Sequence, residues 1–433
     1  MAVTRGGPHH EGPGARPVTT GREQRGRGWQ ENLRGYALEV RGSVREGERG
    51  PVLVVAGLIV IWCVFQGLDD KFLSPRNLSN IGVDIVGTGL VAVGIVFVLL
   101  IREIDLSVGS VSGLAGAAFA VLNVNHGVPE WLAVIVAVAV GTAVGAFHGV
   151  FHAWLGVPAF VVTLAGLLIW NGLTLYLLGA SGTINIDEEG LVASLTSRHF
   201  GADAAAYAVA ALGTAGYLLA ARRRRSRHRA AGMPYPPERE IWLRTALLAV
   251  AAFAAAHTLN RFQGLPLALL IFLVVLVVSD YVLRRTRYGR RVYALGGGVE
   301  AARRAGIGVD RVRVAMFMVS GTLAAVGGLF VASGLTSASP TTARAAGSGM
   351  LLINAIAAAV IGGTSLFGGR GSPWSVLLGV LVIQSIASGM ALLGVQDAVQ
   401  FMITGGVLLA AVAADALSRR AAARSGRSRA TPP

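Results

Sequence analysis

The sequence predicts an all-α, polytopic membrane protein with about 10–12 transmembrane helices, some of them discontinuous. Of the 433 residues, 53% are hydrophobic and only 14% are charged, whereas a soluble domain carries about 25% charged residues. Long apolar stretches recur from Pro51 to about Leu417, and many could cross ~30 Å of hydrocarbon. Arginine gathers between particular stretches, which is typical of cytoplasmic loops.

Twelve apolar segments follow one another and account for a single membrane domain, 51–417. Two weak segments could be re-entrant, which would leave ten crossings. The glycines of GTAVG (141–145) predict a tight helix–helix contact. We expect the segments at 51–67, 80–101, 107–123, 131–150, 158–179, 204–221, 243–260, 265–284, 313–334, 350–364, 374–392 and 398–417.

The net charge of +15 is carried mainly by arginines in the two terminal tails and two loops. The tails, 1–50 and 418–433, are polar and basic, and we expect both to be disordered. The loops are 222–242 and 285–312. With twelve crossings, all four regions fall on one side, so both termini are expected in the cytoplasm. Membrane lipid is an expected partner and nucleic acid is not, because no aromatic residues interleave with the basic ones.

Polar residues interrupt the apolar sequence in VLLIREIDLSVGSVSGLAG (98–116) and in AVIGGTSLFGGRGSPWSVLLG (359–379). Irregular backbone at membrane depth requires surrounding protein or a water-filled path. The two breaks could therefore flank a transport route, or they could be tight cytoplasmic turns. We expect Arg102, Glu103 and Asp105 to satisfy one another at the first break. The candidate pathway residues are Asp84, Glu103, Asp105, Ser107, Thr163, Asn171, Asn354, Thr364 and Ser365.

The sequence lacks the motifs of several enzyme classes. Lys71, the only lysine, lies between Asp70 and Phe72, so there is no Walker A motif. His148 and His152 lack a nearby carboxylate in sequence and are expected at the membrane interface, not on a metal. We therefore expect no enzyme activity, no catalytic residue, no metal site and no cofactor of this chain's own. An ion-coupled transporter with Asp84 as proton carrier is the alternative function.

Five motifs occur in a fixed order: IDLSVGS (104–110), TLAG (163–166), GRRVYALGG (289–297), EAARRAGI (300–307) and IAAAVIGGTSLFGGRGS (356–372). In this order they resemble the membrane permeases of ribose/xylose/arabinose-type sugar ABC importers, most closely the xylose branch. The resemblance implies a homodimeric permease in the bacterial inner membrane that imports a monosaccharide, a pentose such as xylose. It also implies a separate ATPase subunit that binds ATP and Mg, and an extracytoplasmic sugar-binding protein. Asn354 stands where the family commonly has an acid.

The stretch ALGGGVEAARRAGI (294–307) predicts a glycine-rich turn and a short helix. Glu300 can pair with Arg303 and Arg304, and three alanines, 301, 302 and 305, leave a small-residue face. A phosphate cradle is disfavoured because the motif lacks lysine and follows a membrane helix. The alternatives are an amphipathic connector on lipid headgroups and the coupling helix that the resemblance implies. The coupling candidates are Gly297, Glu300, Ala301, Ala302, Arg303, Gly306 and Ile307.

Overall fold

The structure is a computed structural model, and it describes residues 49–179, 182–201, 203–233, 235–338 and 350–428. The predicted N-terminal basic tail, residues 1–50, lies outside the described residues except for positions 49 and 50. The chain divides into two compact units, Met1–Val52 and Leu53–Pro433. All contacts given below lie within the second unit.

Nine helices of the described residues are long and apolar enough to cross a membrane. Three shorter apolar helices join them, namely the Val52–Leu68 part of α2, α15 (Met350–Ile361) and the Ala398–Ala410 part of α17. Each of the twelve predicted segments coincides with one of these helices, which confirms the all-α, polytopic prediction. The nine are α3 (Pro75–Leu100), α4 with a π-helical last turn (Val108–Asn125), α5 (Glu130–Ala153), α6 (Ala159–Leu178), α8 (Asp203–Ala230), α9 (Glu238–Asn260), α10 (Leu267–Arg285), α13 (Val309–Leu335) and α16 (Pro373–Leu392).

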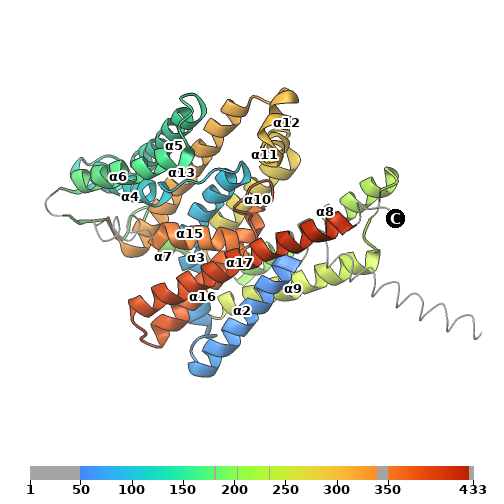
Figure 1. The fold of residues 1–433 in the computed structure, drawn as a ribbon. Coiled ribbons are helices and arrows are strands. Elements are labelled where there is room, and N and C mark those ends of the chain that lie inside the picture. Colours follow the sequence, from blue (N-terminus) through green and yellow to red (C-terminus); the bar gives the residue numbers. More distant parts are fainter. Residues whose placement is uncertain (1–48, 180–181, 202, 234, 339–349, 429–433) are drawn as a thin grey trace, which may run out of the picture. The chain divides into compact units, whose positions relative to one another are not determined.

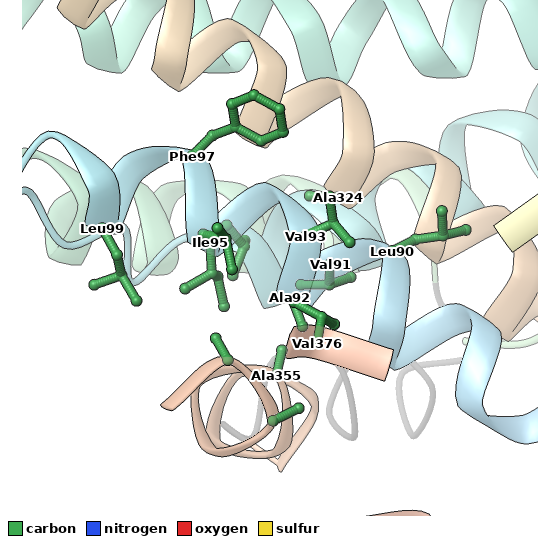
Figure 2. Packing of buried hydrophobic residues seen from close by; sticks show 14 of the residues in the cluster. Leu90, Val91, Ala92, Val93, Ile95, Phe97, Leu99, Ala324, Ala355 and Val376 are labelled. Atoms are coloured by element: carbon green, nitrogen blue, oxygen red, sulfur yellow. The ribbon is translucent and has the colours of Figure 1, made fainter. Parts of the chain in front are cut away.

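Helix α3 lies at the centre of the hydrophobic core (Figure 2). It begins at a Ser74 cap whose hydroxyl accepts from the Asn77 backbone, with Pro75 at the first helical position. Within its most apolar 18-residue stretch, 83% is buried inside the protein. Helices that are apolar all round are typically buried in this way. Around its side chains lie residues of α13, α15 and α16, such as Ala324, Ala355 and Val376.

Helices α5 and α13 approach each other at backbone distance. A Cβ added at Gly149 would lie 2.7 Å from the Cα of Val314, and one added at Gly321 would lie 3.1 Å from the Cα of Gly145. Gly141 also contacts Gly321. These contacts confirm the tight helix packing predicted from GTAVG, because residues without side chains let two helix backbones meet.

Short strands fasten the segment between α6 and α8 to the loops at the same end of the bundle. Strand β1 (Ile184–Asn185) pairs antiparallel with β4 (Ser337–Ala338), and β2 (His199–Phe200) pairs antiparallel with β3 (Leu265–Pro266). Between the strands, α7 (Ser194–Ser197) contacts α13 through Thr196 and Ser333, whose hydroxyls lie 2.8 Å apart. The described part of this segment is therefore folded against the helices.

Two segments predicted as loop or tail are helical. Helix α8 continues through Ala230, so only 231–237 of the predicted loop 222–242 connects α8 to α9. Helix α17 (Asp397–Ser428) likewise continues past residue 417 into the predicted disordered tail. Both predictions were wrong in extent because arginine and alanine are strong helix formers, and charge alone does not end a helix. The α8 helix ends before Gly232, whose φ is +66°.

Candidate functional site

Three turns meet at one end of the bundle, and we call this region the junction: residues 100–107, 293–297 and 364–371. The Gly369 amide donates to the Leu100 carbonyl at 3.0 Å. Tyr293 donates its hydroxyl to the Gly371 carbonyl at 2.9 Å. Gly296 is so close that a Cβ there would lie 2.8 Å from the Gly369 nitrogen. The two sequence breaks and the predicted coupling loop are thus in direct contact.

Arg102 holds the turn after α3 to the end of α11 (Arg287–Gly297). Its Nε donates to the Gly296 carbonyl at 2.6 Å, and its Nη2 donates to the Gly297 carbonyl at 3.0 Å. Carbonyls at a helix C-terminus carry partial negative charge, so a guanidinium strengthens both hydrogen bonds. Arg102 has a φ of +67°, an uncommon conformation for a residue with a side chain. The surrounding contacts therefore impose this conformation.

Helix α11 is amphipathic and is seated on the core by its apolar face. Val292 and Leu295 are fully buried, and Tyr288 and Tyr293 pack against the same cluster. The Thr286 hydroxyl caps the helix by accepting from the Gly289 amide at 3.1 Å. Burial raises the pKa of both tyrosine hydroxyls, and that of Tyr293 donates to the Gly371 carbonyl. The helix is anchored along its length.

Helix α12 (Val299–Arg304) follows directly and presents a charged, small-residue face. Glu300 and Arg303 form an exposed ion pair at 3.1 Å. The helix ends at Gly306, whose φ is +76°. The Gly306 amide donates to the Arg303 carbonyl, and the Ile307 amide donates to the Ala302 carbonyl. This is the Schellman arrangement, which confirms the predicted helix end.

The structure corrects two details of α12. Ala302 is only 2% exposed, so it faces the protein's own core and not an approaching surface. The exposed small residues are Ala301 and Ala305. The ion pair described at Glu300 is with Arg303, not with Arg304 as also predicted. A two-turn helix has one inward face, and the sequence did not show which alanine occupies it.

Glu103 bridges α5 and α13 at the junction. Its Oε1 lies 2.9 Å from Nε2 of His152 on α5 and 3.3 Å from Nη2 of Arg313 on α13. These three side chains are each less than one-fifth exposed. The other ring nitrogen of His152 lies 2.9 Å from the Val157 carbonyl. A carboxylate that accepts a hydrogen bond from an arginine of α13 and contacts a histidine of α5 fixes those helix ends relative to the turn.

Asp105 is the centre of a buried hydrogen-bond network. One carboxylate oxygen accepts from the Ser107 amide at 3.0 Å and from the Ser107 hydroxyl at 2.6 Å. The other accepts from the Ser320 hydroxyl of α13 at 3.1 Å. Ser107 also lies 3.3 Å from Nδ1 of His148, and Trp170 donates to Nε2 of His148 at 3.0 Å. Every link is satisfied when His148 is neutral with its proton on Nδ1.

The prediction that Arg102, Glu103 and Asp105 satisfy one another was wrong. Each has a different partner element: α11 for Arg102, α5 and α13 for Glu103, and the start of α4 with α13 for Asp105. The prediction that His148 and His152 are interfacial was also wrong, since they are 1% and 8% exposed. Their four-residue spacing places them on one helix face, but their carboxylate neighbours lie more than 40 residues earlier in the chain.

Three further candidates, Thr163 of α6 and Thr364 and Ser365 of the second break, form hydrogen bonds near their own positions. Thr163 donates to the Ala159 carbonyl at 2.9 Å and lies 3.4 Å from the Ile104 carbonyl. Thr364 and Ser365 are buried, and the Ser365 hydroxyl accepts from the Phe367 amide at 3.2 Å. The junction thus brings Glu103, Asp105, Ser107, Thr163, Thr364 and Ser365 to one end of the bundle.

Asp84, Asn171 and Asn354 lie along three different helices, α3, α6 and α15. Asp84 accepts from the Gln384 side chain of α16 at 3.3 Å. Two further polar contacts reach α16 nearby, Ser388 to Asn77 at 2.9 Å and Trp62 to Ser385 at 2.9 Å. The Asn354 Oδ1 is buried without a hydrogen-bond partner. An unsatisfied buried oxygen of this kind can accept from water or from a polar solute.

Comparisons with known proteins agree with this architecture. Residues 77–412 match the family described as "Branched-chain amino acid transport system / permease component". The chain is 36% identical to the xylose transport system permease protein XylH of Escherichia coli K12, over 85% of this chain and 92% of that protein. It is 34% identical to the ribose import permease protein RbsC of Bacillus subtilis, over 84% and 92%.

The L-arabinose transport system permease protein AraH of Escherichia coli K12 is 31% identical, over 86% of this chain and 91% of that protein. No solved structure matches the chain. The family match covers most of the chain and includes all three turns of the junction. This chain is therefore a multi-pass membrane protein that belongs to the transport-system permease component family.

Proposed function

We propose that the chain is the permease subunit of an ABC importer and forms the translocation pathway for a monosaccharide, a pentose such as xylose. The observation that carries this proposal is the 36% identity to a xylose permease along 85% of the chain. The relatives whose names specify ribose and arabinose support the same class of substrate. Two copies of the chain would form the complete pathway.

The energy comes from a separate ATPase subunit, which binds ATP and Mg. Its docking surface is the exposed face of α12, formed by Glu300, Ala301, Arg303 and Ala305, with Gly297 and Gly306 at its two ends. This face is supported from behind by the buried Ala302 and by α11. A helix that is exposed on one side and packed against the core on the other can transmit a movement of the bound ATPase to the membrane helices.

The junction transmits this movement from α11 and α12 to the membrane helices. Arg102 links the end of α11 to the turn before α4. Glu103 then links the turn to α5 and α13, and Asp105 links it to α13. Because protein interiors are close-packed, a displacement at one end of such a chain of contacts moves the elements at the other end. The sequence TLAG contributes through Thr163, beside the Ile104 carbonyl.

The pathway itself needs only weak polar contacts, because a separate extracytoplasmic binding protein selects and delivers the sugar. Sugar hydroxyls both donate and accept, and carboxamide and carboxylate oxygens suit them. Asp84, Asn171 and Asn354 supply such groups on α3, α6 and α15. The unpaired Oδ1 of Asn354 is a ready acceptor.

We also propose that the junction and both termini lie in the cytoplasm of a bacterium. The ends of α8 and α10 and the start of α13 carry arginine clusters, and these ends fall on one side when the helices alternate in direction. The strands β1 to β4 then lie on the extracytoplasmic side, where the binding protein would dock.

Uptake of labelled xylose, ribose and arabinose into proteoliposomes tests the proposal. The vesicles contain this chain, its ATPase and its binding protein, with ATP inside or outside. We expect uptake that requires ATP on the ATPase side and is unaffected by an uncoupler. Uptake that collapses with the uncoupler but survives ATP removal would overturn the proposal and favour ion-coupled transport through Asp84. Transport of none of the pentoses by an ATP-competent complex would contradict the substrate class.

A further inference from the structure

A hollow of about 380 Å³ opens between α8 and α10 at their basic ends. Two arginines of α8 and one of α10 line it, together with a tyrosine of α10. The part of its wall toward the apolar sequence of α8 is built from small and aliphatic residues. The lining residues named here are Gly216, Leu219, Ala220, Arg223, Arg227, Tyr281 and Arg285.

Helical spacing explains why these side chains converge. Arg223 and Arg227 are four residues apart on α8, and Tyr281 and Arg285 are four residues apart on α10. Residues at this spacing are neighbours on one helix face. Gly216 lies on the same face of α8 and has no side chain to fill the space. The result is an open hollow with positive charge along two walls.

On the other side of α8, two arginines have partners on α9. Arg225 pairs with Glu238 at 2.6 Å, and the Arg222 guanidinium lies 4.9 Å from the centre of the Trp242 ring. On α10, Arg284 pairs with Asp280 at 2.7 Å.

The three arginines of the hollow, Arg223, Arg227 and Arg285, differ from these paired ones. Within the part of the chain that the structure describes, none of the three has a carboxylate at ion-pair distance. All three side chains are exposed, and Arg285 also interacts electrostatically with Asp280, the carboxylate that pairs with Arg284. Positive charge therefore exceeds negative charge around the hollow. The hollow therefore has the charge of an anion site whose anion comes from outside the chain.

The sequence places the hollow at the membrane surface. On both helices apolar residues give way to arginine at this level, in YLLAARRRR (217–225) and VVSDYVLRR (277–285). Tyr281 and Leu219 are 62% and 55% exposed, so they face outward from the bundle. Tyrosine is enriched at the level of lipid headgroups, and basic pockets between transmembrane helices bind anionic headgroups.

We propose that this hollow binds the headgroup of an anionic phospholipid. Its phosphate is held by Arg223, Arg227 and Arg285, and its acyl chains run along Leu219. The bound lipid fastens α8 to α10, helices whose apolar windows are only 11% and 28% buried by protein contacts. A free phosphate shares the charge but not the acyl chains, so the two sources can be separated.

The test uses the purified, delipidated full chain in neutral detergent. Cardiolipin, phosphatidylglycerol or phosphatidylcholine is added, and retained lipids are counted by native mass spectrometry while thermal unfolding is followed. We expect the two anionic lipids to be retained and to raise the unfolding temperature. The triple variant Arg223→Gln, Arg227→Gln and Arg285→Gln should weaken anionic-lipid retention by about tenfold.

A matched triple variant, Arg224→Gln, Arg229→Gln and Arg239→Gln, removes the same charge from exposed positions outside the hollow. It should retain anionic lipid as the parent does. Equal losses from both triples would mean that only the general surface charge attracts lipid, which overturns the site. Stabilisation by inorganic phosphate to the same extent as by phosphatidylglycerol would overturn the assignment to lipid.

Discussion

Two basic regions of the chain, the end of α8 and the α11–α12 region, differ in how much of each is buried against the rest of the protein. The arginines at the end of α8 lie on a helix whose apolar window is 11% buried, and their described partners come from α9 (Figure 1). The α11–α12 region is also basic, yet Val292, Leu295 and Ala302 are buried in the core. Arg102 and Tyr293 also tie this region to both sequence breaks. The two regions therefore differ in their attachment to the core and not in the sign of their charge, and the coupling role that we propose for α12 depends on that attachment.

The largest effect is expected at Asp105, which joins the start of α4 to α13 beside the turn that Arg102 links to α11. Asp105→Ala leaves Ser107, Ser320 and a backbone amide without their buried acceptor. Leaving a buried donor without its acceptor costs about 1–3 kcal/mol for each donor. We expect a clear fall in the unfolding temperature and in assembly, measured by fluorescence-detected chromatography on heating. Asp203→Ala, at the exposed start of α8, is the control, and equal mild effects would show the network to be dispensable.

The second expected effect is at Arg102, where a substitution should reduce ATP-driven uptake without preventing folding or ATPase binding. Arg102→Gln removes the charge from two hydrogen bonds to α11 while the buried network above it remains. Charge-assisted hydrogen bonds contribute about 1.5–3 kcal/mol each. We expect the ATPase to co-purify normally, while ATP-driven uptake falls by about tenfold or more. Arg370→Gln, an exposed arginine of the neighbouring turn, should transport as the parent does. Normal uptake by Arg102→Gln would contradict the link.

Tryptophan substitutions on α12 sharpen the assignment of its two faces. Ala301→Trp and Ala305→Trp enlarge exposed positions, so they should block ATPase binding without changing the unfolding temperature. Ala302→Trp enlarges a buried position and should instead destabilise the protein, by about 1–3 kcal/mol. Co-purification of the ATPase and thermal unfolding are measured together. If all three variants recruit the ATPase, α12 is a connector and its exposed face is not the docking surface.

The smallest effect is expected on the α8 side of the comparison. Arg225→Gln breaks the ion pair with Glu238, which is 74% exposed, and exposed pairs contribute only about 0–1 kcal/mol. We expect ATPase recruitment and uptake within experimental error of the parent. If this variant folds normally but no longer binds the ATPase, the docking surface lies at the α8–α9 connection and not on α12.

The positions of the helices and of the breaks could be read from the sequence. The apolar segments, a tight helix contact at Gly141 and Gly145, and the helix end at Gly306 were all predicted and found, whereas the structure identified α13 as the partner in that contact. These features depend on residues close together in the chain. The partners of the polar residues could not be read in this way, since Glu103 and Arg313 are 210 positions apart.

The sequence by itself determined that this chain is a helical membrane protein, where its apolar segments lie and which loops are basic. The transfer of apolar side chains out of water and the placement of charged ones depend on each residue separately, so the order of residues along the chain is enough to determine these features. Only the tertiary structure decided that Ala302 faces inward, that Arg102, Glu103 and Asp105 hold different helices, and that three arginines surround one hollow. Those outcomes depend on which helices pack together and in what rotation, and packing brings distant residues into contact without leaving a local pattern.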